Sequence, residues 1–184
     1  TLPLTPNRTG VMAHSDIHCL LRFQLYSDTA GERILPLLTS RRVPWRTVMH
    51  ELLWFLGGHT DVAHLHRRGV RIWDQNTTRE FLDSRGLSDV PTGQAGPIYG
   101  AQWRTWGGRG IDQIQRVIDS LRADRYGRRH LVTAWNAEDI DRMALPPCHY
   151  SFQFVVLHAS DGEDRLSCVV NMRSADMAVG VPFN

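Results

Sequence analysis

Residues 150–157 (YSFQFVVL) and 166–173 (LSCVVNMR) decide the fold of this chain, because they are two β-rich runs joined by a short polar turn. The turn contains Asp161 and Gly162, residue types that favour a reversal of the chain, so the two runs predict a β-hairpin. A third β-rich run, LVTAW, precedes them at residues 131–135. The C-terminal half of the chain is therefore predicted to be mainly sheet.

Helical spacing of apolar residues marks two segments before this sheet. In residues 45–56 (WRTVMHELLWFL) apolar side chains recur every three or four positions until Gly57 and Gly58 end the pattern, which predicts a buried helix. Residues 111–121 (IDQIQRVIDSL) carry one apolar stripe opposite polar positions, which predicts a helix on the surface of the sheet. Alternation in residues 17–26 predicts a strand before the first helix. This pattern of elements is that of an α/β protein.

Length and composition predict one soluble globular domain. The chain has 184 residues, of which 42% are hydrophobic and 22% charged, and it contains no apolar run of about 18 residues that would span a membrane. Residues 77–96 are polar and rich in turn formers, which predicts a surface loop with one short helix. The first ten residues lack the basic start and apolar block of a secretory signal, so secretion is not expected.

Charge and cysteine content narrow the possible partners. A net charge of +2 without a basic stripe does not predict a nucleic-acid-binding surface. All 21 basic residues are arginines, which excludes Schiff-base chemistry through lysine and suits bidentate phosphate binding. Three widely spaced cysteines favour reduced thiols in a cytoplasm over a disulfide framework.

Cys148 is the candidate nucleophile. Pro146 and Pro147 fix the backbone before it and remove two N–H donors at the entrance to a predicted strand, so the thiol has a defined direction. We interpret Cys19 and Cys168 as small buried apolar residues. Three arginines, namely Arg128, Arg129 and Arg173, are candidates to supply positive potential that would lower the thiol pKa, although the sequence alone does not place them near Cys148.

The segment MALPPCH at residues 143–149 resembles the nucleophile segment of the thymidylate synthase family. Further segments resemble the same family in family order: NRTG at 7–10, HELLWFL at 50–56, IWD at 72–74, GPIYGAQWR at 96–104, RRH at 128–130, AWN at 134–136, RSAD at 173–176 and GVPFN at 180–184. The resemblance implies an α/β (α+β) fold in which a large mixed β-sheet, flanked by helices, packs against the sheet of a dimer mate. It also implies that residues 1–184 form a single thymidylate synthase-like domain, with the C-terminal part of the family pattern absent.

The activity implied by this resemblance is one-carbon transfer from 5,10-methylenetetrahydrofolate to C5 of a uracil nucleotide, dUMP, without a metal. The thiolate of Cys148 would add to C6 of the ring, and Glu51 would pass protons through water to O4 and to the folate. Tyr99 and His149 match family residues that help in proton removal at C5 and in ordering water near O4. Trp73 would wall off the methylene intermediate.

The resemblance also implies the binding residues and a homodimer. The 5′-phosphate would be held by Arg8, Arg173 and Ser174 of one subunit and by Arg128 and Arg129 of the partner. Asn184 would read the uracil base by accepting from N3–H and donating to O4. The implied folate contacts are Ile72, Trp73, Leu145, Asp176, Gly180 and Phe183, with Asp176 addressing the pterin beside the substrate.

Two other functions stay open from the sequence. Asn171 and Met172 resemble the phage-type deoxypyrimidine hydroxymethylases, in which water takes the place of hydride at the same intermediate, whereas Trp73, the LPPCH run and Asn184 favour the synthase. The second alternative is a non-catalytic fragment that only binds nucleotide or pairs with a partner chain. No metal site is expected, because His59, His64 and His66 lack an accompanying set of carboxylates or cysteines.

Overall fold

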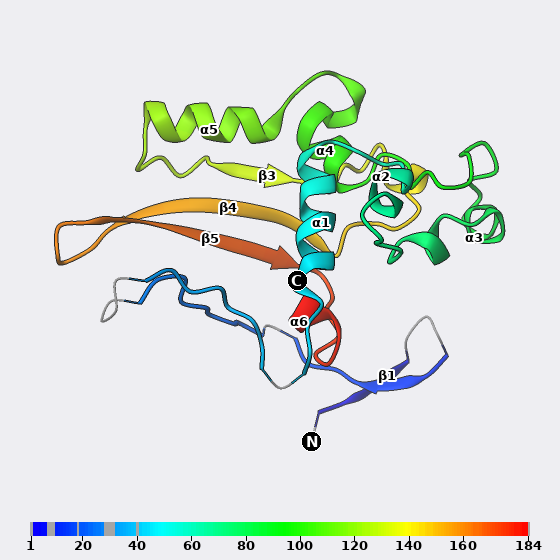
Figure 1. The fold of residues 1–184 in the computed structure, drawn as a ribbon, viewed down its shortest axis with the longest axis horizontal. Helices are drawn as coiled ribbons and strands as arrows, with labels where there is room; N and C mark the ends of the chain where they lie inside the picture. Colours follow the sequence, from blue (N-terminus) through cyan, green and yellow to red (C-terminus); the bar gives the residue numbers. More distant parts are fainter. Residues whose placement is uncertain (1, 7–9, 18, 28–31, 40, 184) are drawn as a thin grey trace. The chain divides into compact units, whose positions relative to one another are not determined.

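The computed structural model describes residues 2–6, 10–17, 19–27, 32–39 and 41–183 (Figure 1). The chain divides into two compact units, residues 1–41 and residues 42–184, which are described separately. The single domain expected from the length stays a prediction.

The first unit contains one small antiparallel sheet. It pairs β1 (Leu4–Pro6) with β2 (Met12–His14), so that Leu4 faces His14 and Pro6 faces Met12. The strand predicted at residues 17–26 is wrong for the described part of that range, where Tyr26 alone forms an isolated bridge, to Arg33. Its alternating apolar side chains are exposed, and an extended segment becomes a strand only when a partner satisfies its backbone groups.

The second unit is built around a three-stranded antiparallel sheet. Its strands β3 (Leu131–Thr133), β4 (His149–His158) and β5 (Asp164–Met172) lie in the order β3-β4-β5 (Figure 1). The β4–β5 hairpin is confirmed, with Phe154 opposite Cys168, and its turn uses Gly162 at a φ of 86°. The resemblance implied a large mixed sheet. Among the described residues of this unit, the sheet consists of these three strands, and both of its strand pairs are antiparallel.

Helices complete the second unit and confirm the α/β class. They are α1 (Trp45–Leu56), α2 (Ala63–His66), α3 (Arg79–Ser84), α4 (Tyr99–Thr105), α5 (Gln113–Ala123) and α6 (Gly180–Phe183), with 3-10 turns η1 (Asp74–Asn76), η2 (Trp106–Gly108) and η3 (Ile140–Arg142). The loop predicted at residues 77–96 holds one short helix, α3, as expected. None of the helices in the described ranges is long and apolar enough to cross a membrane.

Helix α5 confirms the amphipathic pattern and lies along the β3 edge of the sheet (Figure 1). Asp112 caps its N-terminus by accepting a hydrogen bond from the backbone N–H of Gln115. The side chain of Gln113 both donates to the carbonyl of Thr133 and accepts from its N–H, at 2.8 and 3.0 Å. This pair of bonds fastens the start of the helix to β3.

Helix α1 forms where predicted, but it is not a buried helix. Trp54 and Phe55 are buried, whereas Leu52 and Leu53 keep 42% and 56% of their surface exposed. The buried side therefore lies at the C-terminal end of the helix, where Phe55 packs against α4, and most of the predicted apolar stripe is open. A helical apolar stripe identifies a face that packs well, but not whether a segment of the same chain covers it.

Candidate functional site

Cys148 lies immediately before β4, in a loop that α4 holds in place. Its backbone N–H donates a hydrogen bond of 2.8 Å to the hydroxyl of Tyr99, the first residue of α4. Its carbonyl accepts from the backbone N–H of Arg173 at 2.9 Å. The β4–β5 register shifts between His149 and Ser151, an irregularity that redirects side chains at the strand entrance. The cysteine is thus fixed through its backbone on both sides.

Arg173 grips the same loop with its side chain. Its Nε donates to the carbonyl of Pro147 at 2.8 Å, and one terminal nitrogen donates to the carbonyl of Pro146 at 2.9 Å. That terminal nitrogen also lies 3.5 Å from the sulfur of Cys148. The guanidinium therefore supplies positive charge beside a half-buried thiol, the setting in which cysteines react as nucleophiles.

A half-buried carboxyl group lies in the same region of the second unit. Glu51 on α1 accepts a hydrogen bond of 2.6 Å from the indole N–H of Trp73. Burial raises the pKa of Glu51 above its ordinary value, and the bond from Trp73 opposes part of that rise. Such a carboxyl group keeps its proton to higher pH than an exposed glutamate and is suited to proton transfer.

Aromatic rings join the cysteine side of the site to the carboxyl side. The ring of Tyr99 stacks on that of His149 with centroids 4.3 Å apart, and Phe55 lies 4.6 Å from Tyr99. Trp73 meets Phe55 edge-on at 6.2 Å. Burial raises the pKa of the Tyr99 hydroxyl well above its ordinary value, with Glu51 among the nearby charges that add to the rise.

Two glycines explain how α4 comes so near to its neighbours. A Cβ atom on Gly100 would lie 2.5 Å from the carbonyl oxygen of Phe55, and one on Gly96 would lie 2.2 Å from that of Arg142. Gly96 also has a φ of 73°, a backbone conformation that residues with a Cβ atom rarely adopt. The GPIYG segment therefore lets α4 touch both α1 and the loop that leads to Cys148.

Among the residues expected to contact folate, Phe183 lines an apolar cavity of the second unit, and the other five are not part of its lining. The cavity has a volume of about 610 Å³ and lies between α1, α5 and the β4–β5 hairpin, with Glu51, His149 and Phe183 in its lining. Ile72 is exposed, whereas Leu145 and Gly180 are half-buried. Asp176 uses one carboxylate oxygen to accept from the backbone N–H groups of residues 178 and 179, and Ser174 is exposed.

Arg128 and Arg129 are not brought to Cys148 in this chain. Both are exposed in the segment between α5 and β3, and no contact links either of them to Cys148 or Arg173 among the described residues. The side chain of Gln153 donates to the carbonyl of Arg128 at 3.0 Å, and Arg129 lines a separate surface hollow of about 450 Å³. Arg8 and Asn184 lie outside the described residues.

Asp164 on the hairpin holds the start of this arginine segment. Its carboxylate contacts His158 at 3.0 Å, Arg125 at 2.9 Å and the hydroxyl of Tyr126 at 2.8 Å. These bonds, that of His158 first, lower the pKa of Asp164 to about 2. The arginine pair is thereby attached to β4 and β5, not to the loop of Cys148.

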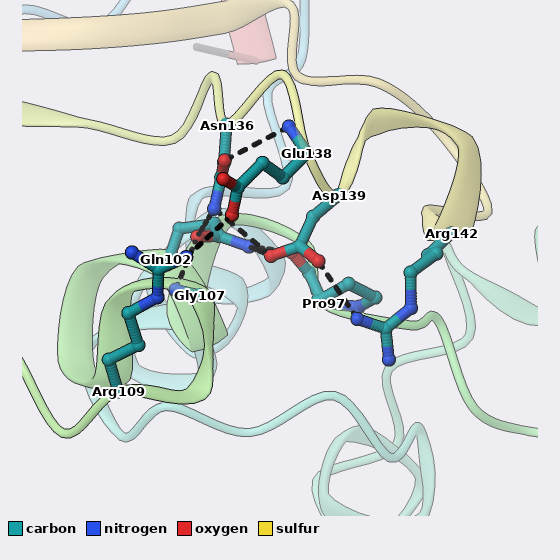
Figure 2. Close-up of polar contacts among 8 residues, drawn as sticks. All are labelled: Pro97, Gln102, Gly107, Arg109, Asn136, Glu138, Asp139 and Arg142. Carbon is teal, nitrogen blue, oxygen red and sulfur yellow. Dashed lines mark hydrogen bonds and ion pairs between the residues drawn. The ribbon is translucent and has the colours of Figure 1, made fainter.

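Sequence reasoning placed two cysteines incorrectly and missed one polar cluster. Cys19 and Cys168 are exposed, so their interpretation as buried apolar residues is wrong; Cys168 faces the open apolar cavity. The missed cluster joins Gln102, Asn136 and Asp139 in a buried hydrogen-bond network (Figure 2). Gln102 and Asn136 belong to quoted family segments, but nothing in the sequence indicated that Asp139 lies between them.

Metal-ligating side chains do not gather in the described part of the chain. No group of three or more histidines, cysteines, aspartates or glutamates there could hold a metal ion. The rings of His59 and His64 stack at 3.8 Å, an aromatic contact.

A fixed cysteine beside an arginine, together with a half-buried carboxyl group whose pKa is raised, defines a candidate site for covalent catalysis by a thiolate. Comparison with known proteins is consistent with that class: residues 4–184 match the family model described as thymidylate synthase. The chain is 48% identical over 186 residues to a thymidylate synthase of Ascaris suum, covering 95% of this chain and 62% of the relative. It is 47% identical over 179 residues to that of Saccharomyces cerevisiae, covering 89% and 57%.

The human thymidylate synthase is similarly close, at 43% identity over 189 residues, which are 97% of this chain and 57% of the relative. The chain belongs to the thymidylate synthase family. It spans about three fifths of the length of these curated relatives.

Proposed function

We propose that this chain carries the nucleophilic half of a thymidylate synthase, a methyltransferase that adds one carbon from 5,10-methylenetetrahydrofolate to C5 of dUMP and so makes dTMP. The observation that carries the proposal is the grip of Arg173 on Cys148, with its guanidinium 3.5 Å from the sulfur and bonded to the two preceding carbonyls. The relatives that match most of the chain are named thymidylate synthases, which supports the same activity.

In this mechanism Cys148 forms a bond to C6 of the uracil ring, and the electron pair moves to O4 as an enolate. Glu51 supplies a proton toward O4 through water, because its raised pKa keeps a proton available. The enolate makes C5 nucleophilic toward the methylene carbon of the folate. Tyr99 and His149, stacked beside the cysteine, assist removal of the C5 proton. Loss of that proton expels tetrahydrofolate from the bridging carbon, which stays on C5 as a methylene group. Hydride from the tetrahydrofolate completes the methyl group and converts the folate to dihydrofolate, and Cys148 is expelled from C6.

Binding is divided between residues near Cys148 and residues elsewhere. Arg173, Ser174 and Arg8 would hold the 5′-phosphate from one subunit, and Asn184 would read the base. The cavity lined by Glu51 and Phe183 offers an apolar surface of the kind an aromatic pterin needs. Trp73, which donates a hydrogen bond to Glu51, would wall off the methylene intermediate. Ile72, Leu145, Asp176 and Gly180 complete the proposed folate contacts.

A homodimer would complete the site. Leu131, Leu157 and Val169 leave one sheet face with exposed apolar side chains, from 46% to 55% exposed, which suits packing against a second copy. The partner would then supply Arg128 and Arg129, which do not reach Cys148 within the chain. We also propose a cytoplasmic location, supported by free cysteines at 19, 148 and 168.

The test is covalent capture. The protein incubated with 5-fluoro-dUMP and methylenetetrahydrofolate should retain the nucleotide through denaturation, with the adduct on the peptide that contains Cys148. A protein that binds the nucleotide reversibly and never forms the adduct would be the non-catalytic binding module instead. Release of dihydrofolate with dUMP identifies the synthase, whereas tetrahydrofolate and a product carrying one extra oxygen identify the hydroxymethylase.

A further inference from the structure

A buried polar cluster packs against α4 close to the cysteine loop, and the proposed reaction makes no use of it. Its members, Gln102, Asn136 and Asp139, are exposed by only 1%, 5% and 5% (Figure 2). Burying amides and a carboxylate is costly unless their hydrogen bonds are made, so a cluster of this kind holds its neighbours in a defined arrangement.

Gln102 is the centre of the cluster, and its amide is fully used. Its nitrogen donates to the carbonyl of Pro97 and to Oδ2 of Asp139, both at 2.9 Å. Its oxygen accepts from the backbone N–H of Gly107 and from the amide nitrogen of Asn136, both at 3.1 Å. An amide offers two donor and two acceptor positions, and all four are occupied here.

Asp139 sets the orientation of both amides. Its Oδ2 accepts from Gln102 and from Asn136, the latter at 3.1 Å, and its Oδ1 accepts from Arg142 at 2.9 Å (Figure 2). A carboxylate accepts only, so the nitrogens of both amides must turn toward it. Replacing it by an amide of the same size would place donors against donors.

The cluster connects to Cys148 along two paths. Gln102 lies one helical turn beyond Tyr99 on α4, and Asp139 lies just before η3, in the segment that leads to Cys148. The paths meet again where the N–H of Cys148 bonds to the hydroxyl of Tyr99 at 2.8 Å. Between these two points the segment is also held by the backbone bond from residue 144 to the carbonyl of residue 95, at 3.0 Å, and by the close approach of Gly96 to the carbonyl of Arg142. The Gln102–Asp139 contact is thus one of the interactions that set the position of the cysteine loop against α4, and it is the one made by a buried carboxylate.

We propose that Asp139 is a positioning residue for Cys148, acting through Gln102 on α4 and so on Tyr99. It holds the loop where the sulfur lies beside the guanidinium of Arg173. The proposal rests on the proposed function only in naming Cys148 as the nucleophile of that reaction, and its first test needs no substrate.

That test compares the alkylation of two cysteines in one molecule. In the intact protein carrying Asp139→Asn, iodoacetamide should modify Cys148 about threefold to tenfold more slowly, the factor that corresponds to one ordinary hydrogen bond. Cys168, which is exposed on β5, should react at its original rate and serves as the internal reference. Peptide mass spectrometry follows both sites in the same sample.

The matched control is Glu138→Gln, a change of the adjacent carboxylate. Glu138 pairs with Arg109 at 2.9 Å on the surface, with 72% of its side chain exposed, and its carboxylate makes no bond to Gln102 (Figure 2). This variant should leave both alkylation rates unchanged. Asp139→Glu keeps an acceptor-only group and should recover part of the Cys148 rate.

Two results would overturn the proposal. In Asp139→Asn, an unchanged ratio of the Cys148 and Cys168 rates, with only a lower Tm, would make Asp139 a stability residue. If Asp139→Asn does not fold, Arg142→Ala replaces it, because it removes one partner of the carboxylate and leaves Gln102 and Asp139 in place. A smaller fall in the Cys148 rate is then expected, and no fall would reject the positioning role.

A kinetic measurement adds the link to the reaction. In Asp139→Asn, kcat should fall by the same factor while KM for dUMP changes less than twofold, because the phosphate-binding arginines lie outside the cluster. Absence of any 5-fluoro-dUMP adduct in the unmodified protein would refute the proposed function alone, since the alkylation comparison does not depend on it.

Discussion

The two arginine-bearing regions of the proposed site are held in opposite ways. Arg173 binds the loop of Cys148 with its side chain and its backbone, so one chain organises the nucleophile by itself. Arg128 and Arg129 project from an exposed segment that is attached to the hairpin through Gln153 and Asp164. The contrast indicates that the chain holds its candidate nucleophile with its own residues, whereas the phosphate site that we propose would need the arginines of a second copy.

The largest effect should come from the nucleophile. Cys148→Ser is expected to abolish covalent capture of 5-fluoro-dUMP, because a hydroxyl is a far weaker nucleophile than a thiolate at neutral pH. Reversible nucleotide binding, followed by calorimetry, should persist. Cys19→Ser, a change of an exposed cysteine in the first unit, is the control and should behave as the unmodified protein. Normal turnover by Cys148→Ser would sink the mechanism.

The carboxyl group should rank next. Glu51→Gln is expected to lower kcat by about 10²–10⁴, the usual contribution of a positioned acid or base. The covalent adduct should still form, since Cys148 and Arg173 keep their contacts. Glu80→Gln, a change of an exposed glutamate at the start of α3, is the control. Turnover within twofold of the unmodified protein would remove Glu51 from the site.

Stability provides a second measure of the same carboxyl group. Its pKa is raised in the folded protein, so the folded state binds the proton more tightly than the unfolded state does. The resulting stabilisation is complete below the ordinary glutamate pKa and is lost as pH rises through the higher folded value. Relative to the unmodified protein, Glu51→Gln should therefore gain Tm as pH rises through that window. An equal Tm difference at every pH would contradict the raised pKa.

The arginine pair should give a moderate effect that depends on the partner. Arg129→Ala is expected to raise KM for dUMP by about 10- to 100-fold, the factor for one charged hydrogen bond to phosphate, with kcat less affected. Mixed dimers of Arg129→Ala with Cys148→Ser should regain activity, because one of their two sites combines an intact cysteine with an intact partner arginine. Failure of every mixture to regain activity would argue against sharing. Arg122→Ala, at the exposed end of α5, is the control.

The sequence predicted local order better than it predicted what covers a surface. Local sequence signals suffice for the hairpin and for α5. Asp161 and Gly162 favour the turn of the hairpin, and Asp112 caps the N-terminus of the helix. The stripe of α1 was assigned to the core, yet spacing cannot say whether a covering segment belongs to the same chain. The same limit explains Cys168, which faces an open cavity. The prediction of a strand at residues 17–26 was wrong because a strand also needs a partner strand, and the local sequence does not specify that partner.

Site residues show the same division. Family segments brought attention to Cys148, Glu51, Tyr99 and Arg173, and the structure brings these four into one region. No signal in the sequence indicated that Asp139 is buried, because an aspartate beside a turn is usually a surface residue. Its burial follows from the side-chain amides of Gln102 and Asn136, which only the folded chain brings to it. Buried polar partners depend on three-dimensional proximity, which no spacing rule supplies.

The smallest expected effect separates two roles of Trp73, its hydrogen bond and its ring. Trp73→Phe removes the 2.6 Å bond to Glu51 but keeps an aromatic wall against Phe55. That bond lowers the pKa of Glu51, so its loss should raise this pKa further and move the corresponding limb of the kcat profile to higher pH. The decrease in kcat at the optimum should be about threefold to tenfold, as for one hydrogen bond.

Trp73→Gly also removes the aromatic ring, so this variant should admit water to the methylene intermediate and release some hydroxymethyl nucleotide, whereas Trp73→Phe should release none. Equal amounts of hydroxymethyl product from both variants would show that the hydrogen bond to Glu51, and not the ring of Trp73, excludes water. Glu51 would then have two roles in the region of the nucleophile, proton transfer and the exclusion of water.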